Sequence, residues 1–142
     1  MPVRQRGIDL DTMFNARVTI SADVSVTATS SATGNTCITT GAFNIENGGT
    51  YYVECYAPYL TVGTTNLDVE LWDSATFLSS LSGHMAASIP RPGAQFGVFV
   101  SLASGSHTLT VKAFVDAGTG HFGANNGATG NAPNAWLTVS PT

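Results

Sequence analysis

Three histidines, His84, His107 and His121, lie in a serine-rich chain, and this combination raises the question of nucleophilic catalysis. A nucleophilic serine needs a positioned base, and hydrolases usually place it on a sharp turn of the form Gly-x-Ser-x-Gly. The chain instead has Ser104-Gly105-Ser106-His107 in an expected hairpin turn, where the strand pattern predicts that His107 points outward. His84 and His121 have no partner at i+2 or i+4 that would indicate a metal site. We therefore expect no catalytic residue and no bound metal.

Carboxylates are the second group that could do chemistry, because a glycosidase needs two acids that converge in a cleft. Glu46, Glu54 and Glu70 fall on different expected strands, at positions whose alternation predicts exposure to solvent. We therefore interpret them as solvated surface residues. The protein is expected not to be an enzyme and to need no cofactor.

Amides and aromatic rings near the C-terminus suggest a different activity, carbohydrate binding. A sugar pocket can be built from amide groups and a stacking ring, and the chain offers Asn125, Asn126 and Asn131 with Phe122 and Trp136. A flexible polar loop explains the same residues without any ligand. A lectin-like β-sandwich module that binds a host glycan is therefore kept as the alternative function.

Charge and composition exclude several functional classes. Charged residues form 10% of the 142-residue chain, against about 25% in ordinary globular proteins. The net charge of −4 argues against nucleic-acid binding, which requires a basic face. No stretch has the apolar character of a signal peptide or a membrane span, so we expect a soluble protein without a membrane partner.

Two cysteines, Cys37 and Cys55, are too few for a disulfide framework. They fall on neighbouring expected strands, so a single disulfide is conceivable. Two buried thiols are the other possibility, because free cysteine behaves as a small core residue.

From residue 18 onward, apolar residues alternate with polar ones, as in half-buried strands. A stretch with two prolines at 89–93 is not expected to be regular structure, and the Gly/Asn-rich residues 118–133 are expected to form a loop. The fold class is all-β: one domain over residues 18–142, a sandwich or a barrel, after an arm of residues 1–17. The expected strands are 18–28, 36–45, 50–60, 67–72, 76–87, 96–102, 107–115 and 135–139.

The stretch FNIENGGTYYVECYA, residues 43–57, predicts a strand, a tight turn and a second strand. Its spacing of Phe43, Ile45, Gly49, Tyr51 and Val53 resembles the jelly roll of complement globular heads and the tumour-necrosis-factor-like superfamily. The alternating strand at 66–72, an expected hairpin of 98–102 with 109–111 and the closing strand at 134–139 extend the resemblance over most of the chain. It implies a single antiparallel jelly-roll β-sandwich of about eight strands.

Members of that superfamily typically form homotrimers around an axis lined by aromatic and aliphatic residues. The resemblance therefore implies a homotrimer here, without saying which strand face forms the axis. Calcium sites of some members need carboxylates clustered on loops, whereas Asp68, Glu70 and Asp73 lie on an expected strand, so no metal site is implied. The candidates for the trimer interface are Tyr52, Tyr56, Tyr59, Trp72 and Trp136.

The N-terminal arm, residues 1–17, differs from the rest of the chain because it holds three of the five basic residues. Its apolar side chains are too few to form a core, so they either lie loosely on their own domain or bind pockets on another chain. The opening Arg6 to Phe14 resembles the Gly-x-Asp-Leu-x-x-x-Phe start of virion proteins from phages of actinobacteria. The residues expected to contact a partner are Arg4, Arg6, Ile8, Leu10, Met13, Phe14 and Arg17.

Small jelly rolls recur in tailed bacteriophages as capsid decorations, head fibres and minor tail parts, and this similarity gives the main functional hypothesis. It implies a structural protein of the virion, made in the host cytoplasm and assembled as a homotrimer. The arm would attach this trimer to the major capsid protein or a tail protein. A secreted trimer of the signalling type is a third possibility, which the missing signal peptide disfavours.

Overall fold

The computed structural model of the protein describes residues 17–20, 24–61, 66–81, 91–123 and 134–142, and for residues 58–61 and 91–93 it describes the backbone only. These residues form strands and one 3-10 turn, η1 (Ser31–Thr33). The strands are β1 (Val18–Ile20), β2 (Val24–Val26), β3 (Asn35–Thr39), β4 (Phe43–Ile45), β5 (Gly49–Thr61), β6 (Leu67–Asp73), β7 (Thr76–Ser80), β8 (Arg91–Leu102), β9 (Gly105–His107), β10 (Leu109–Val115), β11 (Gly120–Gly123) and β12 (Ala135–Pro141). No helix within the described part of the chain is long and apolar enough to cross a membrane.

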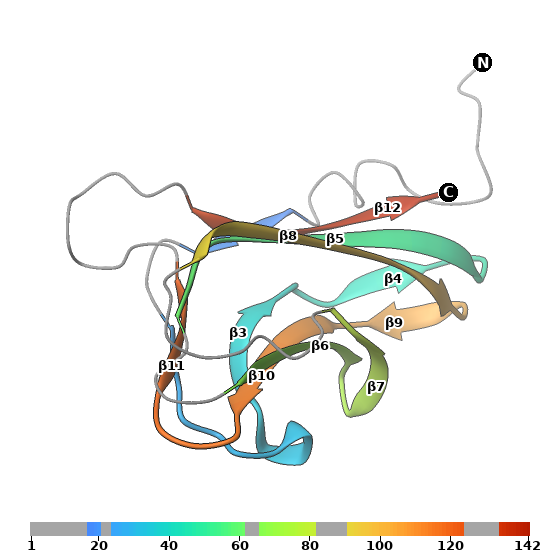
Figure 1. Ribbon diagram of the computed structural model, residues 1–142. Coiled ribbons are helices and arrows are strands. Elements are labelled where there is room, and N and C mark those ends of the chain that lie inside the picture. The colour runs from blue at the N-terminus through green and yellow to red at the C-terminus, as the bar shows by residue number, and fades with distance from the viewer. Residues whose placement is uncertain (1–16, 21–23, 62–65, 82–90, 124–133) are drawn as a thin grey trace.

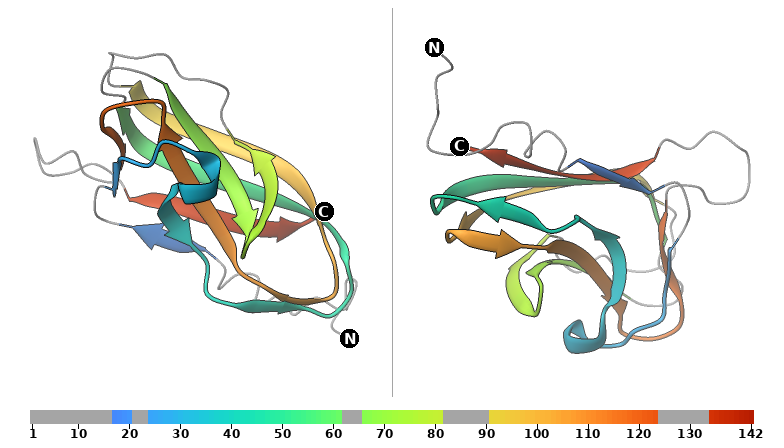
Figure 2. Two further views of the ribbon diagram at one scale, coloured as in Figure 1. Left: turned by 90° about the horizontal axis from the view of Figure 1, so that it is seen from below. Right: turned by 180° about the vertical axis from the view of Figure 1, so that it is seen from behind.

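Two antiparallel sheets form the layers of the molecule (Figures 1 and 2). In the sheet that we call sheet A, β5 pairs with β8 along one side and with β12 and β11 along the other, and β1 and β2 extend it. Sheet B has the order β3-β10-β6-β7. The short strands β4 and β9 pair with each other beside these layers. The fold is an all-β, antiparallel jelly-roll sandwich, as the sequence predicts.

The core lies between the sheets and follows from the alternation of side chains along each strand. From sheet A, the inward positions of β5 and β12 bury Val53, Cys55 and Leu137. From sheet B, β6 and β10 bury Leu71 and Val111 completely. Burial of one such aliphatic side chain stabilises the fold by about 1.5–3 kcal/mol. The outward positions of the same strands are left to contact solvent or a ligand.

Several expected strands are interrupted, which is why the structure has more than about eight. The expected strand 18–28 divides into β1, which pairs with β12, and β2, which pairs with β11. The expected strand 36–45 divides near Gly41 into β3, in sheet B, and β4, which pairs with β9. Alternation predicted the strand residues on either side of these interruptions correctly, but it says nothing about where a strand changes its partner.

Residues 43–57 form a strand, a turn and a strand as predicted, but the two strands do not pair with each other. β4 pairs with β9, whereas β5 pairs with β8 and β12. The expected hairpin of 98–102 with 109–111 is likewise wrong, because β10 pairs with β6 and β3. The chain leaves sheet A between β8 and β9, where Gly105 has a φ of 133°.

The prolines at 89–93 do not prevent regular structure throughout that stretch. Arg91 and Pro92 belong to β8 and lie opposite Leu60 and Tyr59 of β5. In the described part of the chain β8 pairs with β5 alone, and an edge strand tolerates a proline because one of its sides needs no hydrogen-bond donors. The expectation of irregular backbone is therefore wrong from Arg91 onward.

The two cysteines are free thiols, and both are buried. Cys37 lies on β3 in sheet B and Cys55 lies on β5 in sheet A, so the expectation of neighbouring strands is wrong. Of the two possibilities left open by the sequence, buried thiols are confirmed. The N-terminal arm lies outside the described residues except for Arg17, so the domain boundary after residue 17 stays a prediction.

Candidate functional site

Aromatic and polar side chains gather on the outward face of sheet A, where β8, β5 and β12 lie side by side (Figure 1). Alternation along each strand places one set of residues in the core and the other set on this face. The outward residues are partly or fully exposed. We call this surface the aromatic platform, and it consists of Tyr52, Tyr56, Phe99, Trp136, Glu54, Gln95 and Thr138.

Strand register arranges the platform in three rows that cross the sheet. Tyr52 lies between Phe99 of β8 and Ser140 of β12 in one outer row. Tyr56 lies between Gln95 of β8 and Trp136 of β12 in the other outer row. The middle row contains Thr138, Glu54 and Gly97.

The first aromatic pair is positioned by a glycine. The rings of Tyr52 and Phe99 are tilted by 46°, and their centroids are 5.0 Å apart. A Cβ atom added to Gly97 would lie 1.9 Å from the Tyr52 hydroxyl oxygen and 2.6 Å from Cζ. The Tyr52 ring therefore lies across β8, over the backbone of Gly97, in space that only a glycine leaves. Phe99 is 65% exposed.

The second aromatic pair joins β5 and β12 in the other outer row. The rings of Tyr56 and Trp136 are stacked with an interplanar angle of 30° and a centroid separation of 5.8 Å. The Arg17 guanidinium lies 5.2 Å from the centroid of the Trp136 ring, within the range of a cation–π contact. Arg17, predicted from the sequence to bind a partner as part of the arm, thus lies at the border of the platform.

The middle row and the adjacent Gln95 supply hydrogen-bonding groups. The Gln95 side-chain amide donates a hydrogen bond to the Glu54 carboxylate across β8 and β5. This bond joins Gln95 of the outer row to Glu54 of the middle row. Carboxylate and amide oxygens accept hydrogen bonds, and the second N–H of the Gln95 amide remains as a donor. The expectation that Glu54 is solvated agrees with its partial exposure.

A separate cluster lies on the opposite side of the sandwich, on the outward face of sheet B. The Lys112 Nζ lies 4.3 Å from the centroid of the Trp72 ring, and Phe77 meets that ring edge-on at 5.7 Å. The Trp72 Nε1–H and the Ser31 hydroxyl both donate to Glu70 Oε2, at 3.0 and 2.7 Å. Glu70 is 8% exposed. The expectation that Glu70 is solvated is therefore wrong, because these donors replace water around its carboxylate.

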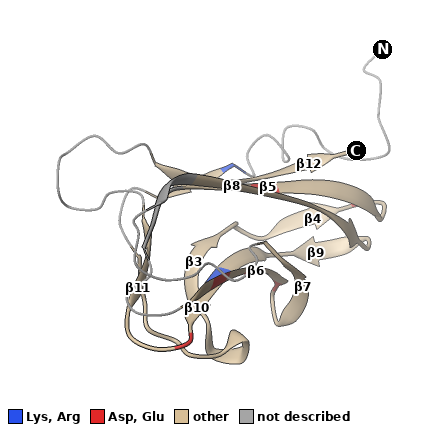
Figure 3. Cartoon of the chain, in the orientation of Figure 1, with Lys and Arg blue, Asp and Glu red and all other residues tan. Residues whose placement is uncertain are grey.

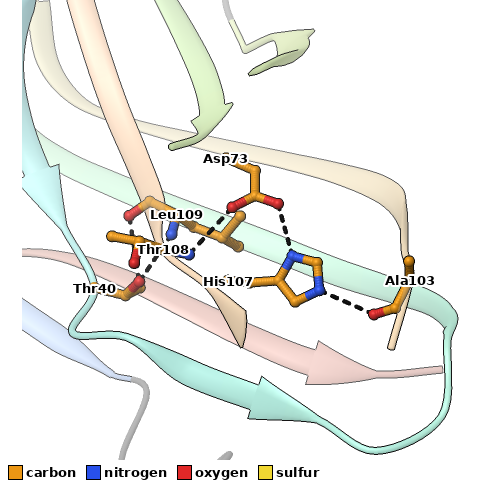
Figure 4. A network of polar contacts seen from close by, with 6 residues as sticks. All are labelled: Thr40, Asp73, Ala103, His107, Thr108 and Leu109. Atoms are coloured by element: carbon orange, nitrogen blue, oxygen red, sulfur yellow. Dashed lines mark hydrogen bonds and ion pairs between the residues drawn. The ribbon is translucent and has the colours of Figure 1, made fainter. Parts of the chain in front are cut away.

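His107 is also placed differently from the expectation. It is buried, and its Nδ1 lies 2.6 Å from Asp73 Oδ2 while its Nε2 lies 2.9 Å from the Ala103 carbonyl oxygen (Figure 4). The other carboxylate oxygen of Asp73, Oδ1, accepts a hydrogen bond from the Thr108 backbone N–H at 3.1 Å. The prediction of an outward His107 is wrong, because β9 pairs with β4 and turns this position toward β6. The contacts connect β6, β9 and the end of β8, which is a structural role.

The residues predicted to line a trimer axis do not share one surface. Tyr52, Tyr56 and Trp136 belong to the platform, whereas Trp72 lies on the other sheet. Tyr59 is a residue of β5 whose side chain is not described.

The predicted lectin-like pocket is not formed as the sequence suggested. Phe122 is completely buried, so its ring cannot stack on a ligand. Asn125, Asn126 and Asn131 lie outside the described residues. Trp136 faces outward, but its neighbours are Tyr56 and Arg17. Alternation along β5 predicted that Tyr52 and Tyr56 lie on one face. Phe99 and Gln95 lie beside them because of the pairing register of β8 with β5, which the sequence did not specify.

Charged groups are few on the described strands (Figure 3). Among the described residues, no group of three or more His, Cys, Asp or Glu side chains is arranged to hold a metal ion. Burial raises the pKa of the Cys55 thiol to about 12, because the low-dielectric core disfavours the thiolate. This cysteine is therefore not suited to act as a nucleophile.

Neither a family model nor a curated protein matches the chain. Solved structures with a similar course of the chain include a carbohydrate-binding module of Cellvibrio mixtus lichenase 5A in complex with cellotriose, at 14% identity and a TM-score of 0.46, covering 92% of this chain and 94% of that one. A family 35 module from Paenibacillus barcinonensis has 15% identity, a TM-score of 0.44 and coverage of 92% and 96%. The C-terminal domain of the sugar-binding protein EclA has 11% identity, a TM-score of 0.45 and coverage of 87% and 81%. No site residue is transferred to this chain at these identities.

These comparisons contradict the main functional hypothesis from the sequence. The similar structures described above are carbohydrate- or sugar-binding domains, and none is a bacteriophage capsid decoration, head fibre or tail part. The hypothesis of a virion accessory protein is therefore wrong. The predicted homotrimer and the capsid or tail partner have no support in the comparisons. The resemblance to complement and tumour-necrosis-factor-like domains and the virion localisation stay predictions of the sequence alone.

Proposed function

We propose that the protein binds carbohydrate on the aromatic platform and carries out no reaction there. The observation on which this proposal rests is the pairing of partly or fully exposed aromatic rings with hydrogen-bonding side chains on one face of sheet A. The alternative function weighed from the sequence is thus retained, with a different set of residues. A glycan contacts the sheet face instead of a pocket in the C-terminal loop.

The chemistry of a sugar ring matches both parts of the platform. One face of a pyranose presents C–H groups, and these lose water when they stack on an aromatic ring. Tyrosine and tryptophan supply such surface at a low cost in conformational entropy, since each has two side-chain torsions. The hydroxyl groups around the sugar ring need donors and acceptors, which Glu54 and Thr138 of the middle row and Gln95 of the neighbouring row provide.

The strands hold these groups in place before a ligand arrives. All platform residues belong to β5, β8 and β12, whose backbones are hydrogen-bonded over long stretches. A site on regular strands loses less entropy on binding than a site on loops. Binding without hydrolysis agrees with the single carboxylate among the platform residues, because glycosidases use a pair.

The test is affinity gel electrophoresis against a panel of soluble polysaccharides, followed by titration calorimetry with those that retard the protein. Trp136→Ala and Tyr56→Ala should each weaken binding about five- to thirty-fold, since a lost stacking face corresponds to about 1–2 kcal/mol. Phe77→Ala is the matched control, because Phe77 is an exposed ring on the opposite sheet.

Binding that is weakened by the platform variants and unchanged by Phe77→Ala supports the proposal. Binding that the Phe77 variant weakens as much as the platform variants would place the glycan elsewhere. No binding to any polysaccharide of the panel would overturn the proposed function.

A further inference from the structure

The charge and dimensions of the platform indicate which class of glycan could bind to it. Tyr52 and Tyr56 are four residues apart on β5, which separates the two aromatic pairs by about 13 Å. Glu54 lies midway, about 7 Å along the strand from each pair. Every position on the platform is therefore within about one Debye length, 8–10 Å, of this carboxylate.

An acidic sugar would meet repulsion from Glu54 over the middle row and over the row of Tyr52 and Phe99. The Glu54 carboxylate accepts a hydrogen bond from the Gln95 amide, which is neutral and does not compensate its charge. Among the described side chains, Arg17 is the cation at the border, and it lies beside Trp136, in the row opposite to Tyr52 and Phe99. The net charge of −4 adds to the repulsion of anionic polymers.

The length of the platform sets the minimum size of the ligand. One pyranose ring is much shorter than about 13 Å and can contact only one aromatic pair at a time. A ligand that stacks on both pairs must therefore contain about three linked sugar units. Its central unit then lies over Glu54, where the carboxylate and the Gln95 amide contact hydroxyl groups.

We infer that the platform binds an internal segment of a neutral polysaccharide, which lies along β5. This inference rests on the proposed function. Glu54 is the residue that determines specificity, since it accepts hydrogen bonds from neutral sugars and repels uronic acids and sulfated sugars. The aromatic pairs determine the length of the bound segment.

The experiment compares neutral with acidic polymers in Glu54→Gln and the unchanged protein. The neutral probes are mixed-linkage β-glucan, xylan and galactomannan, and the acidic probes are polygalacturonate and alginate. Glu54→Gln keeps a side-chain carbonyl but removes the charge, so the ratio of acidic-polymer affinity to neutral-polymer affinity should rise. Affinity for an acidic polymer should rise at least about threefold at low salt, and this gain should shrink at high salt.

Glu46→Gln is the matched control. Glu46 is exposed in the turn between β4 and β5, away from the platform, and its substitution changes the net charge by the same amount. The inference predicts that this variant binds acidic polymers no better than the unchanged protein. An equal gain in the two variants would show that net charge, and not Glu54, excludes acidic glycans.

Oligosaccharides of two to six units, cut from the neutral polymer that binds best, test the length. Affinity should rise steeply up to about three or four units and then level off. Equal affinity for dimers and hexamers, or preferred binding of acidic polymers by the unchanged protein, would overturn the inference and leave the proposed function standing. Absence of binding to every polysaccharide would overturn both.

Discussion

At the scale of single residues, the platform depends on the absence of a side chain at Gly97. Tyr52 and Phe99 face each other across β5 and β8, and the Tyr52 ring reaches over the neighbouring backbone because Gly97 leaves that space open. A glycine usually weakens a strand, since it has no side chain to pack. Here the ring of a tyrosine on the next strand covers it, a contact also used to stabilise glycines in designed sheets.

Gly97→Ala should displace the Tyr52 ring while the fold persists. The added Cβ would lie 1.9 Å from the tip of a partly exposed side chain, which can rotate away. We expect the free energy of unfolding to change by about 1 kcal/mol or less and carbohydrate affinity to fall several-fold. Gly49→Ala is the control, because the nearest atom to its added Cβ is 3.9 Å away. Equal affinity of the two variants would argue against a role of the Tyr52 ring.

At the scale of elements, the exchange of partners between the sheets is the feature that decides where each side chain points. β8 ends in sheet A, and β9, which starts at Gly105, pairs with β4. Because of this change of partner, His107 lies in the interior, where its ring nitrogens contact the Asp73 carboxylate and the Ala103 carbonyl oxygen. A simple hairpin at this place would have left the same histidine on the surface.

Gly105→Ala should destabilise the protein through its backbone alone. The φ of 133° at Gly105 belongs to a region that residues with a Cβ rarely adopt, at a cost of about 1–3 kcal/mol. Among the described residues other than its chain neighbours, no atom lies within 4 Å of a Cβ added to Gly105, so steric clashes with these residues do not contribute. Urea unfolding of Gly105→Ala should show this loss. Gly41→Ala, also without neighbours and without a positive φ, should show less than about 0.5 kcal/mol.

At the scale of the whole molecule, the sequence predicts which residues form strands and which of their faces are buried better than it predicts which strands pair with each other. Period-two alternation identified most strands and the inward residues of β5 and β6, because one face of each strand is buried. It failed at Pro92, at the hairpin after β8 and at His107, because pairing depends on contacts between distant segments.

The candidate site shows the same division between what the sequence specifies and what only the fold specifies. Tyr52, Glu54 and Tyr56 are on one face by parity, and the sequence suffices to place them together. Their partners Phe99, Gln95 and Trp136 come from two distant strands, and only the register brings them into the same rows. The function was predicted wrongly because it rested on the N-terminal arm and a family resemblance, neither of which involves these rows.

The buried thiol of Cys55 makes the stability of the whole fold depend on alkaline pH. Its pKa is about 12 in the folded protein, against 9.0 for the ordinary group, because burial disfavours the thiolate. Below pH 9 the thiol is protonated in both states and its contribution to stability is complete. As the pH rises from 9 toward 12, the unfolded chain ionises first, so the free energy of unfolding falls by up to about 1.4 kcal/mol per pH unit. Burial also raises the pKa of Tyr51, which acts in the same direction.

Cys55→Ala should reduce this alkaline slope, although it lowers stability at pH 8 by removing a buried group. Urea unfolding between pH 8 and 11 measures both effects, and the difference from the unchanged protein should narrow as the pH rises. Val53→Ala is the matched control, since Val53 is equally buried on the same face of β5 and does not titrate. It should lower stability by about 1–3 kcal/mol at every pH, because it removes apolar contacts only. If Cys55→Ala keeps the slope of Val53→Ala, the thiol is not the group whose ionisation drives alkaline unfolding.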